Sequence, residues 1–184
     1  MAVRKVIRMG HPTLRKVAGK LTKQEIQSEE TKALLQDMFD TMLEQGGIGI
    51  AAPQINVSKS VAIIQINPDN DRYDVEEEVP MLVFFNPEIE ILDKTKQGFW
   101  EGCLSVPGLR GYVERPQKVK VTYLDIEGQK QELIAEDFLA TVVQHELDHL
   151  FGKLYIDRVT DREKLMFEDE YLTFHQDEDE PEID

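Results

Sequence analysis

The chain has 184 residues, 41% of them hydrophobic, and a formal net charge of −15 at pH 7. This length suits one domain with a sizeable core, so we expect residues 1–184 to form a single domain, with about residues 176–184 as a flexible acidic tail. The acidic balance disfavours direct nucleic-acid binding, because phosphate contacts depend on Lys and Arg. No apolar run is long enough to cross a bilayer, and residues 1–5 have no apolar stretch behind them of the kind that a secretory signal requires, which predicts a cytoplasmic protein.

A long helix is predicted after an extended N-terminal arm. Residues 3–16 begin with an alternating apolar stretch and turn at residues 10–12, which is typical of a strand or an extended arm. His11 precedes a proline and has no acidic or sulfur neighbour, so we interpret it as structural or exposed. Residues 28–45 predict a helix, because apolar residues recur at spacings of three and four before two glycines. That apolar face consists of Leu34, Leu35, Met38, Phe39, Met42 and Leu43.

Three glycines and two alanines stand close together in residues 46–54. Their spacing excludes the phosphate-binding patterns Gly-x-Gly-x-x-Gly and Gly-Lys-Ser/Thr. Two interpretations remain: a tight turn against a neighbouring strand, or an extended edge whose backbone N–H and C=O groups pair with a peptide-like ligand. In the second case, Gln54 offers an uncharged amide donor at the end of the loop.

The middle of the chain is predicted to be antiparallel β-structure. Alternation over residues 118–124 and 131–134, around a turn at residues 125–128, indicates a hairpin. Because strands run before a helix rather than alternating with helices, we predict an α+β fold: antiparallel β-sheets packed around a central C-terminal helix, plus the long N-terminal helix. Further strands are expected at residues 60–66, 81–86 and 88–92, the last two bent or joined at Pro87, with an acidic loop over residues 67–79.

Two histidines, His145 and His149, stand four residues apart in the predicted C-terminal helix. Residues at i and i+4 share one helical face, so both imidazoles could reach one ion. Glu146 would project beside that ion, placed to take a proton from a water bound to it. Acidic residues at 136–137 favour a helix start there, and Gly152 favours an end. The competing interpretation is a surface or core pair of histidines, since His-Glu-x-x-His also occurs by chance.

Cys103 is the one cysteine, which excludes a disulfide within the chain. It is either a small buried hydrophobe or a reactive or ligating thiol. Gly102 before it and a polar, proline-ended turn after it favour the thiol interpretation. A hydrolytic site of this kind needs three protein ligands and one water. His11 and His175, the latter in the acidic tail, are weaker candidates, so Cys103 is chemically the best third ligand.

Together the three stretches resemble the peptide deformylase family. Its motifs stand in order at residues 47–54 (GIGIAAPQ), 101–105 (EGCLS) and 144–149 (QHELDH). Ile50 replaces the leucine that family members more often carry, a conservative difference that affects no catalytic group. The similarity extends to Arg110, Arg115 and residues 152–158, and covers the chain up to about residue 160.

The resemblance implies a single catalytic domain that removes the N-formyl group from the formyl-methionine of newly synthesised polypeptides and releases formate. Glu146 would act as general base and acid, while the Gln54 side chain and the Leu104 backbone N–H would stabilise the oxyanion. The cofactor implied is one divalent metal ion, ferrous iron in the first place, with Zn, Ni or Co as replacements. Its implied ligands are Cys103, His145 and His149.

Substrate contacts are implied by the same resemblance. The edge at residues 47–49 would pair with the substrate backbone, and an apolar slot would take the methionine side chain, with core packing as the competing interpretation for the slot residues. Arg110 matches a position that can hold a substrate carbonyl, with a surface role as the alternative. Glu101 and Arg115 resemble an ion pair that orients the cysteine loop. The substrate-binding residues implied are Gly47, Ile48, Gly49, Gly102, Arg110, Phe99, Phe138 and Val142.

The implied partners are nascent formylated polypeptides at the ribosome, in a bacterial type of cytoplasm, without nucleic-acid or membrane binding. Two other function classes compete with this one. A metallopeptidase that cuts internal peptide bonds would share the histidine motif but would be indifferent to a formyl group. A non-catalytic binding module would require a broken motif, and every motif residue is present.

Overall fold

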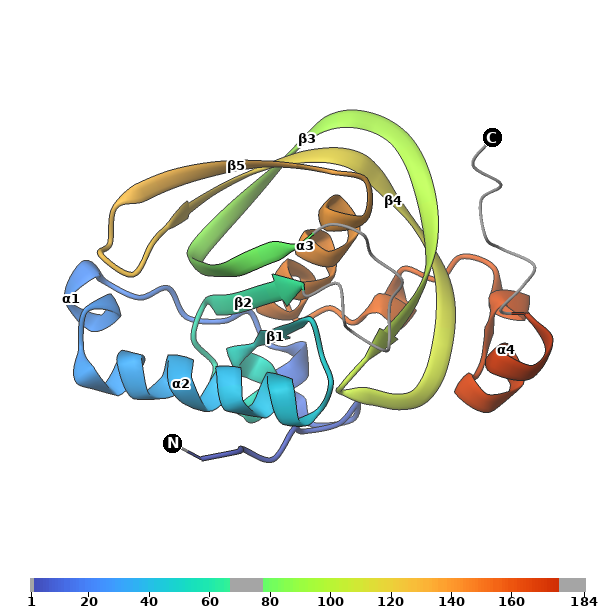
Figure 1. The fold of residues 1–184 in the computed structure, drawn as a ribbon, viewed down its shortest axis with the longest axis horizontal. Coiled ribbons are helices and arrows are strands. Elements are labelled where there is room, and N and C mark those ends of the chain that lie inside the picture. The colour runs from blue at the N-terminus through green and yellow to red at the C-terminus, as the bar shows by residue number, and fades with distance from the viewer. Residues whose placement is uncertain (1, 67–77, 176–184) are drawn as a thin grey trace.

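The computed structural model describes residues 2–66 and 78–175. The acidic loop predicted over residues 67–79 falls mostly outside these residues, and the acidic tail predicted over residues 176–184 falls outside them entirely. The described part is α+β, with an antiparallel sheet and a helix near its C-terminal end (Figure 1).

Local sequence signals account for the helix ends. Ser28 accepts a hydrogen bond from the Thr31 N–H and so caps a helix that begins one residue later. Gly46 follows the same helix with a φ of +63°, a conformation that glycine adopts without strain. The second long helix is followed by Gly152, with a φ of +71°. The helices are α1 (Lys23–Ile26), α2 (Glu29–Glu44), α3 (Asp137–Leu150) and α4 (Glu168–Phe174), with 3₁₀ turns at Pro12–Arg15, Ala52–Ile55, Tyr155–Asp157 and Arg162–Lys164.

One sheet, not several, contains all the strands of the described residues, and its order is β1-β2-β3-β4-β5 with β6 paired to β4. The strands that pair are antiparallel throughout. The prediction of separate sheets was wrong because β3 and β4 are long and bend together over α3, so that one sheet covers two sides of the helix (Figure 1). The strands are β1 (Gly49–Ala51), β2 (Val61–Ile66), β3 (Val79–Cys103), β4 (Val106–Leu124), β5 (Lys130–Glu136) and β6 (Leu165–Phe167).

The turn expected after Cys103 is present but short, and a strand flanks it on either side. Strand β3 continues through Pro87 and runs to Cys103, and β4 starts again at Val106 after a two-residue turn. The register shifts between Phe85 and Glu88, which accommodates the proline that cannot donate to the ladder. Residues 3–9, by contrast, form no strand and run as an extended arm.

Helix α3 lies in the middle of the core. Its residues from Ala140 to Leu150 are all buried, packed against β2, β3 and β4 through side chains such as Leu147 and Phe84. A second cluster, which includes Met38 and Met42, packs α2 against β1 and β2. Burying α3 on all sides also buries its polar residues, which is costly unless they are paired or used.

Candidate metal centre

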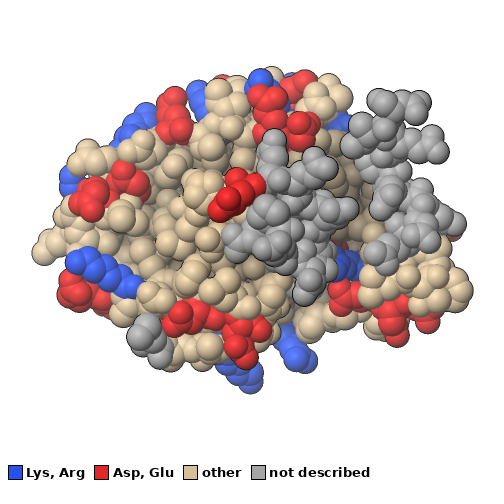
Figure 2. Space-filling view, in the orientation of Figure 1, with Lys and Arg blue, Asp and Glu red and all other residues tan. Residues whose placement is uncertain are grey.

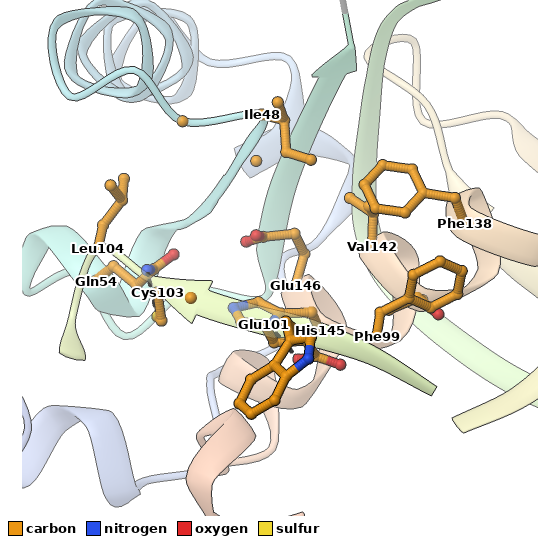
Figure 3. A pocket seen from close by; sticks show the side chains of 15 residues that line it. Ile48, Gln54, Phe99, Glu101, Cys103, Leu104, Phe138, Val142, His145 and Glu146 are labelled. Atoms are coloured by element: carbon orange, nitrogen blue, oxygen red, sulfur yellow. Dashed lines mark hydrogen bonds and ion pairs between the residues drawn. The ribbon is translucent and has the colours of Figure 1, made fainter. Parts of the chain in front are cut away.

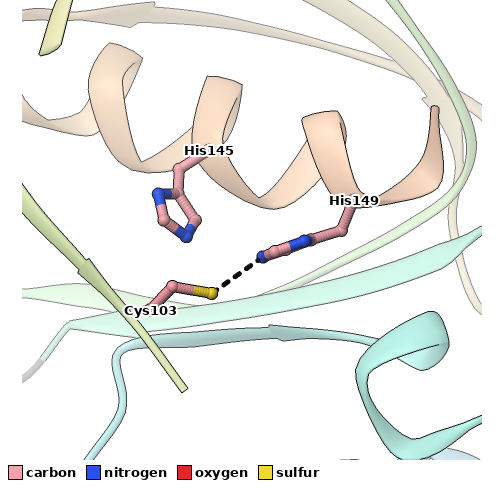
Figure 4. Close-up of side chains that lie close together, drawn as sticks. All are labelled: Cys103, His145 and His149. Carbon is pink, nitrogen blue, oxygen red and sulfur yellow. Dashed lines mark hydrogen bonds between the residues drawn. The ribbon is translucent and has the colours of Figure 1, made fainter. Parts of the chain in front are cut away.

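Three metal-ligating side chains meet where α3 passes the end of β3. His145 and His149 lie one helical turn apart, and Figure 4 shows both rings directed toward Cys103. The Sγ atom of Cys103 lies 3.4 Å from Nε2 of His149, and the candidate ligand atoms of all three residues lie within 4.8 Å of one another. All three residues are buried.

A chain of hydrogen bonds between charged side chains supports this cluster. The Nδ1 atom of His145 donates to Glu101 at 2.7 Å, which leaves its Nε2 for the cluster. Arg115 donates to both oxygens of Glu101, at 2.6 and 3.0 Å, and to Asp148 at 2.9 Å. Arg158 holds the other oxygen of Asp148 at 2.6 Å. The ion pair between Glu101 and Arg115 is therefore present, and it orients both the cysteine strand and the first histidine.

The two imidazoles change the acidity of the thiol. Burial alone would raise the pKa of Cys103, but the positive charge of His149 and the hydrogen bonds from both rings lower it from 9.0 to about 5. Burial would likewise lower the pKa of His145, yet Cys103 and Glu101 raise it well above its ordinary value. The cysteine is thus a thiolate at neutral pH, which is the form that binds metals.

We therefore expect the thiolate absorbance of the metal-free protein to persist on acidification down to a pH of about 5. The sign follows from the lowered pKa, since the thiolate form is lost only below it, whereas an unperturbed cysteine loses it below about 8.5. Ultraviolet difference spectra against a Cys103→Ala variant measure this transition. A midpoint near the unperturbed value would contradict the charge arrangement described here.

This donor set fits a single metal ion. One thiolate and two imidazoles match the ligands of sites that bind zinc, iron, nickel and copper, and three protein ligands leave a coordination position open. The spacing of the ligand atoms, all within 4.8 Å of one another, is compatible with bonds of about 2.0–2.3 Å to one central ion.

Glu146 follows His145 on α3 and lines the same cavity as Cys103. Its Oε2 atom is buried and has no hydrogen-bond partner among the described residues. Burial raises its pKa above the ordinary value, despite the opposing charges of the two histidines. A Cβ atom on Gly49 would lie 2.6 Å from Oε1 of Glu146, so only glycine allows strand β1 to pass this carboxylate so closely.

Gln54 is oriented by its own loop. Its Oε1 accepts a hydrogen bond from the Ala51 N–H at 2.8 Å, which turns the amide NH₂ toward the cysteine. The Nε2 atom then lies 3.6 Å from Sγ of Cys103. Leu104 follows the cysteine in the β3–β4 turn and lines the same cavity. An amide donor, a buried carboxylate and two of the three candidate ligands, Cys103 and His145, thus line one cavity.

The chain matches a known protein family over most of its length. Residues 3–165 match the model of the polypeptide deformylase family. A peptide deformylase of Leptospira biflexa is 48% identical over 159 residues, which are 86% of this chain and 89% of that protein. A second, from Pseudomonas syringae pv. tomato, is 42% identical over 167 residues, 91% of this chain and 93% of that protein. The chain belongs to the peptide deformylase family.

Solved structures of the family share this fold. The Met-Ala-Ser-bound class I type b peptide deformylase of Acinetobacter baumannii superposes with a TM-score of 0.82 at 41% identity, covering 86% of this chain and 99% of that one. The Plasmodium falciparum peptide deformylase, in complex with an inhibitor, superposes with a TM-score of 0.72 at 36% identity, covering 85% and 90% of the two chains. As a member of this family the chain is a hydrolase that removes the N-formyl group from nascent polypeptides.

The cavity of this deformylase is partly open to solvent, and Glu146 belongs to its lining. Figure 3 shows Ile48, Phe99, Phe138 and Val142 gathered on one side of that carboxylate. The rings of Phe99 and Phe138 meet edge to face, with centroids 5.5 Å apart. Of the eight residues expected to bind substrate, the cavity is lined by Gly47, Ile48, Gly49, Gly102, Phe99, Phe138 and Val142.

Arg110 is the eighth, and it lies behind the cavity wall, paired with Glu168. Trp100 and Thr141 line the cavity but were not expected there. Alternation along β3 places Trp100 two residues before Gly102 on the same face, so the signal for Trp100 was present once the strand was known. His175 was expected in a mobile tail, but its ring centroid lies 6.5 Å from that of Trp100. Among the described residues, no helix is long and apolar enough to span a bilayer.

Proposed function

We propose that this deformylase acts on formyl-methionine at the start of newly made polypeptides, using one divalent ion held by Cys103, His145 and His149. The observation that supports this assignment is the meeting of these three candidate ligands beside a cavity lined by Cys103, His145 and Glu146, where the buried Oε2 of Glu146 has no hydrogen-bond partner among the described residues. Residues 1–184 would then form a single catalytic domain. The whole arrangement needs no residue outside the described ranges.

Ferrous iron is the ion we propose, with Zn, Ni or Co as replacements. When bound, the ion supplies Lewis-acid chemistry: it lowers the pKa of a water and polarises a carbonyl. The protein would contribute the Cys103 thiolate and one ring nitrogen from each histidine, and the chain of hydrogen bonds from His145 through Glu101 to Arg115 fixes the orientation of the His145 ring. Metal analysis of protein purified without oxygen identifies the ion. A thiolate beside ferrous iron also predicts inactivation in air.

Glu146 would carry the proton. Its buried carboxylate takes a proton from the attacking water at one oxygen and returns it to the departing amine nitrogen, so that formate and a free N-terminus result. The pKa of Glu146, raised by burial, favours both steps, because a carboxyl group with a higher pKa is a stronger base and still a competent acid near neutral pH.

Gln54 and Leu104 would stabilise the oxyanion that forms at the formyl oxygen. The Gln54 amide is pre-oriented by the Ala51 N–H, and such a fixed donor is worth more than one that must reorganise during the reaction. The Leu104 backbone N–H lies in the tight turn after β3, next to the ligand Cys103.

Replacing Gln54 with alanine is expected to lower kcat by about 10²–10³-fold, the usual effect of losing one oxyanion donor. Metal content should stay unchanged, because the amide is not among the three ligands. Steady-state formate release, compared at equal metal occupancy, measures the effect. A loss that appears in KM alone would assign Gln54 to substrate binding instead.

Strand β1 would receive the substrate backbone. It is an edge strand of the sheet and, among the described residues, pairs only with β2, and residues 47–49 line the cavity. A peptide lying along this edge would extend the sheet by one strand. The methionine side chain would then enter the apolar part of the cavity, where Phe99 and Phe138 offer the aromatic contacts that a thioether favours.

Comparing formyl-Met-Ala, acetyl-Met-Ala and a longer blocked peptide tests this function. We expect rapid formate release from the first and little reaction with the other two, because a small carbonyl carbon enters a tight site that excludes bulkier acyl groups. Cleavage of internal bonds in the blocked peptide would instead support the metallopeptidase alternative. Encounter with nascent chains at the ribosome, in the cytoplasm, is part of the same proposal.

A further inference from the structure

The N-terminal arm, residues 3–9, is hydrogen-bonded to both loops that carry the proposed oxyanion donors. The Ile7 N–H donates to the C=O of Gln54 at 2.8 Å, and the Met9 N–H donates to the C=O of Ser105 at 2.7 Å. Residues two apart in an extended chain present their N–H groups on the same edge, so one short segment reaches both loops. Figure 1 shows this arm in dark blue, below α2 and directed toward the turn between β3 and β4.

Both accepting carbonyls belong to buried residues. Gln54 is only 1% exposed, and Ser105 is fully buried. The Gln54 C=O stands near the end of the 3₁₀ turn Ala52–Ile55, where a helix leaves carbonyls without partners of its own. Ser105 shares a two-residue turn with Leu104. A buried carbonyl that loses its donor has to shift toward another one, because leaving it unpaired is costly.

The arm is itself fixed to α2. The Arg4 N–H donates to Oγ1 of Thr41 at 2.8 Å, and the Arg4 side chain forms an ion pair with Asp37 at 2.9 Å. Figure 2 shows basic and acidic side chains next to one another along the lower edge of this face, where α2 and the N-terminal end lie in Figure 1. A chain terminus is ordered where such contacts hold it, so the arm is a fixed part of the structure.

A tight turn directs the end of the arm. The Arg8 C=O accepts a hydrogen bond from the His11 N–H at 3.0 Å, and Gly10 has a φ of +103°, whereas the φ of Met9 is not positive. This is the type II arrangement, with Met9 and Gly10 at its central positions. Proline is common at the first central position of such a turn, so position 9 accepts a residue that lacks only the N–H.

We infer that Ile7 and Met9 are positioning residues: their backbone N–H groups fix the Gln54 loop and the Leu104 turn relative to each other, and so set the distance between the two oxyanion donors. The inference rests on the proposed function, because it assumes that these two groups stabilise an oxyanion. A donor that is displaced, though still present, lowers the rate of the chemical step more than it weakens substrate binding.

Met9→Pro tests the role of one N–H. We expect kcat for formyl-Met-Ala-Ser to fall about 10- to 100-fold relative to Met9→Ala, which loses the same side chain but keeps the N–H. KM and metal content should match those of Met9→Ala, because no cavity residue and no ligand is altered. Equal kcat values in the two variants would overturn the inference. So would a loss of metal in parallel with kcat, since the arm would then support the ligand strand instead.

Arg8→Pro is the matched control. Arg8 is exposed, and its N–H makes no hydrogen bond among the described residues, so this variant adds a proline to the arm without removing a bond. Its kcat should equal that of the unmodified enzyme, and a loss as large as that of Met9→Pro would contradict the inference. If Met9→Pro does not fold, the α-hydroxy acid analogue of methionine at position 9 replaces the same N–H by oxygen, adds no ring and should lower kcat in the same way.

Ile7→Pro tests the second N–H through its partner. Relative to Ile7→Ala, it should lower kcat in an otherwise unmodified enzyme. In the Gln54→Ala background it should have little further effect, because the amide through which it acts is already gone. A general loosening of the structure would lower kcat equally in both backgrounds, and that result would overturn the inference.

A binding measurement separates positioning from substrate contact. Trp100 is the one tryptophan of the chain and lines the cavity, so its emission follows binding of the product peptide Met-Ala-Ser. The affinity should be equal in Met9→Pro and Met9→Ala, and a weaker affinity in Met9→Pro would assign the arm to substrate binding instead. If Gln54→Ala kept its kcat, the oxyanion assignment itself would fail. If Gln54→Ala lost kcat while Ile7→Pro and Met9→Pro did not, only the role of the arm would fail.

Discussion

Replacing Glu146 with alanine is expected to reduce formate release by about 10²–10⁴-fold, while the metal stays bound. The carboxylate is not one of the three candidate ligands, but its Oε2 is buried and without a hydrogen-bond partner among the described residues, and Glu146 lines the same cavity as Cys103 and His145. In the proposed mechanism, removing it takes away the group that would move the proton from water to the leaving nitrogen. Elemental analysis together with a formate assay measures both halves of this expectation.

Glu132→Ala serves as the control for that variant, because Glu132 is exposed on β5 and lies outside the cavity. Its activity and metal content should match those of the unmodified enzyme. If Glu146→Ala retained its turnover with full metal content, the proton would have to travel through another group, and the assignment of the base would be wrong.

Replacing Cys103 with serine is expected to remove the metal. The thiol has a pKa of about 5 and is ionised at neutral pH, whereas a serine hydroxyl stays protonated and binds such ions weakly. Loss of a supporting hydrogen bond already costs roughly 10–100-fold in metal affinity, so loss of a ligand should exceed that range. Titration against a competing chelator gives the affinity, and activity should fall in parallel.

Ser105→Ala is the matched control in the same turn. The Ser105 hydroxyl is buried and makes no hydrogen bond within the described residues, so its removal changes the turn little while the ligand stays. Retained metal in Ser105→Ala would show that Cys103→Ser loses its metal because the thiolate is missing, and not because the turn is disturbed. Tight metal binding by Cys103→Ser would instead mean that the thiolate is not a ligand.

The parts of this site that could be predicted are those whose signal is local. The i, i+4 spacing of His145 and His149 depends only on helical geometry, and the helix that contains them has an apolar face of its own. Cys103 was assigned by chemistry, as the one remaining soft ligand, and the structure places it in the cluster. The helix predicted over residues 28–45 corresponds to α2, whose observed bounds are Glu29–Glu44.

The features that could not be predicted depend on contacts between distant segments. Pro87 is compatible with one bent strand or with two joined strands, and the structure has one strand, because β3 pairs with β2 up to Phe85 and with β4 from Phe85 to Cys103. The pairing of Arg115 with Asp148 joins residues 33 positions apart, and the pairing of Arg110 with Glu168 joins residues 58 apart. The sequence near α4 contains no motif, and its position depends on such pairs and on the ring of Trp100.

Strand β1 has only three residues, lies at the edge of the sheet, and contributes Gly49 to the cavity lining. Long bare sheet edges promote association between molecules, and shortness is one way in which proteins limit that danger. A short edge also offers few hydrogen bonds, and those it offers are to main-chain groups that every polypeptide shares. Used in this way, β1 would make the enzyme tolerant of the side chains that come after methionine, so that one catalyst could process products of many different genes.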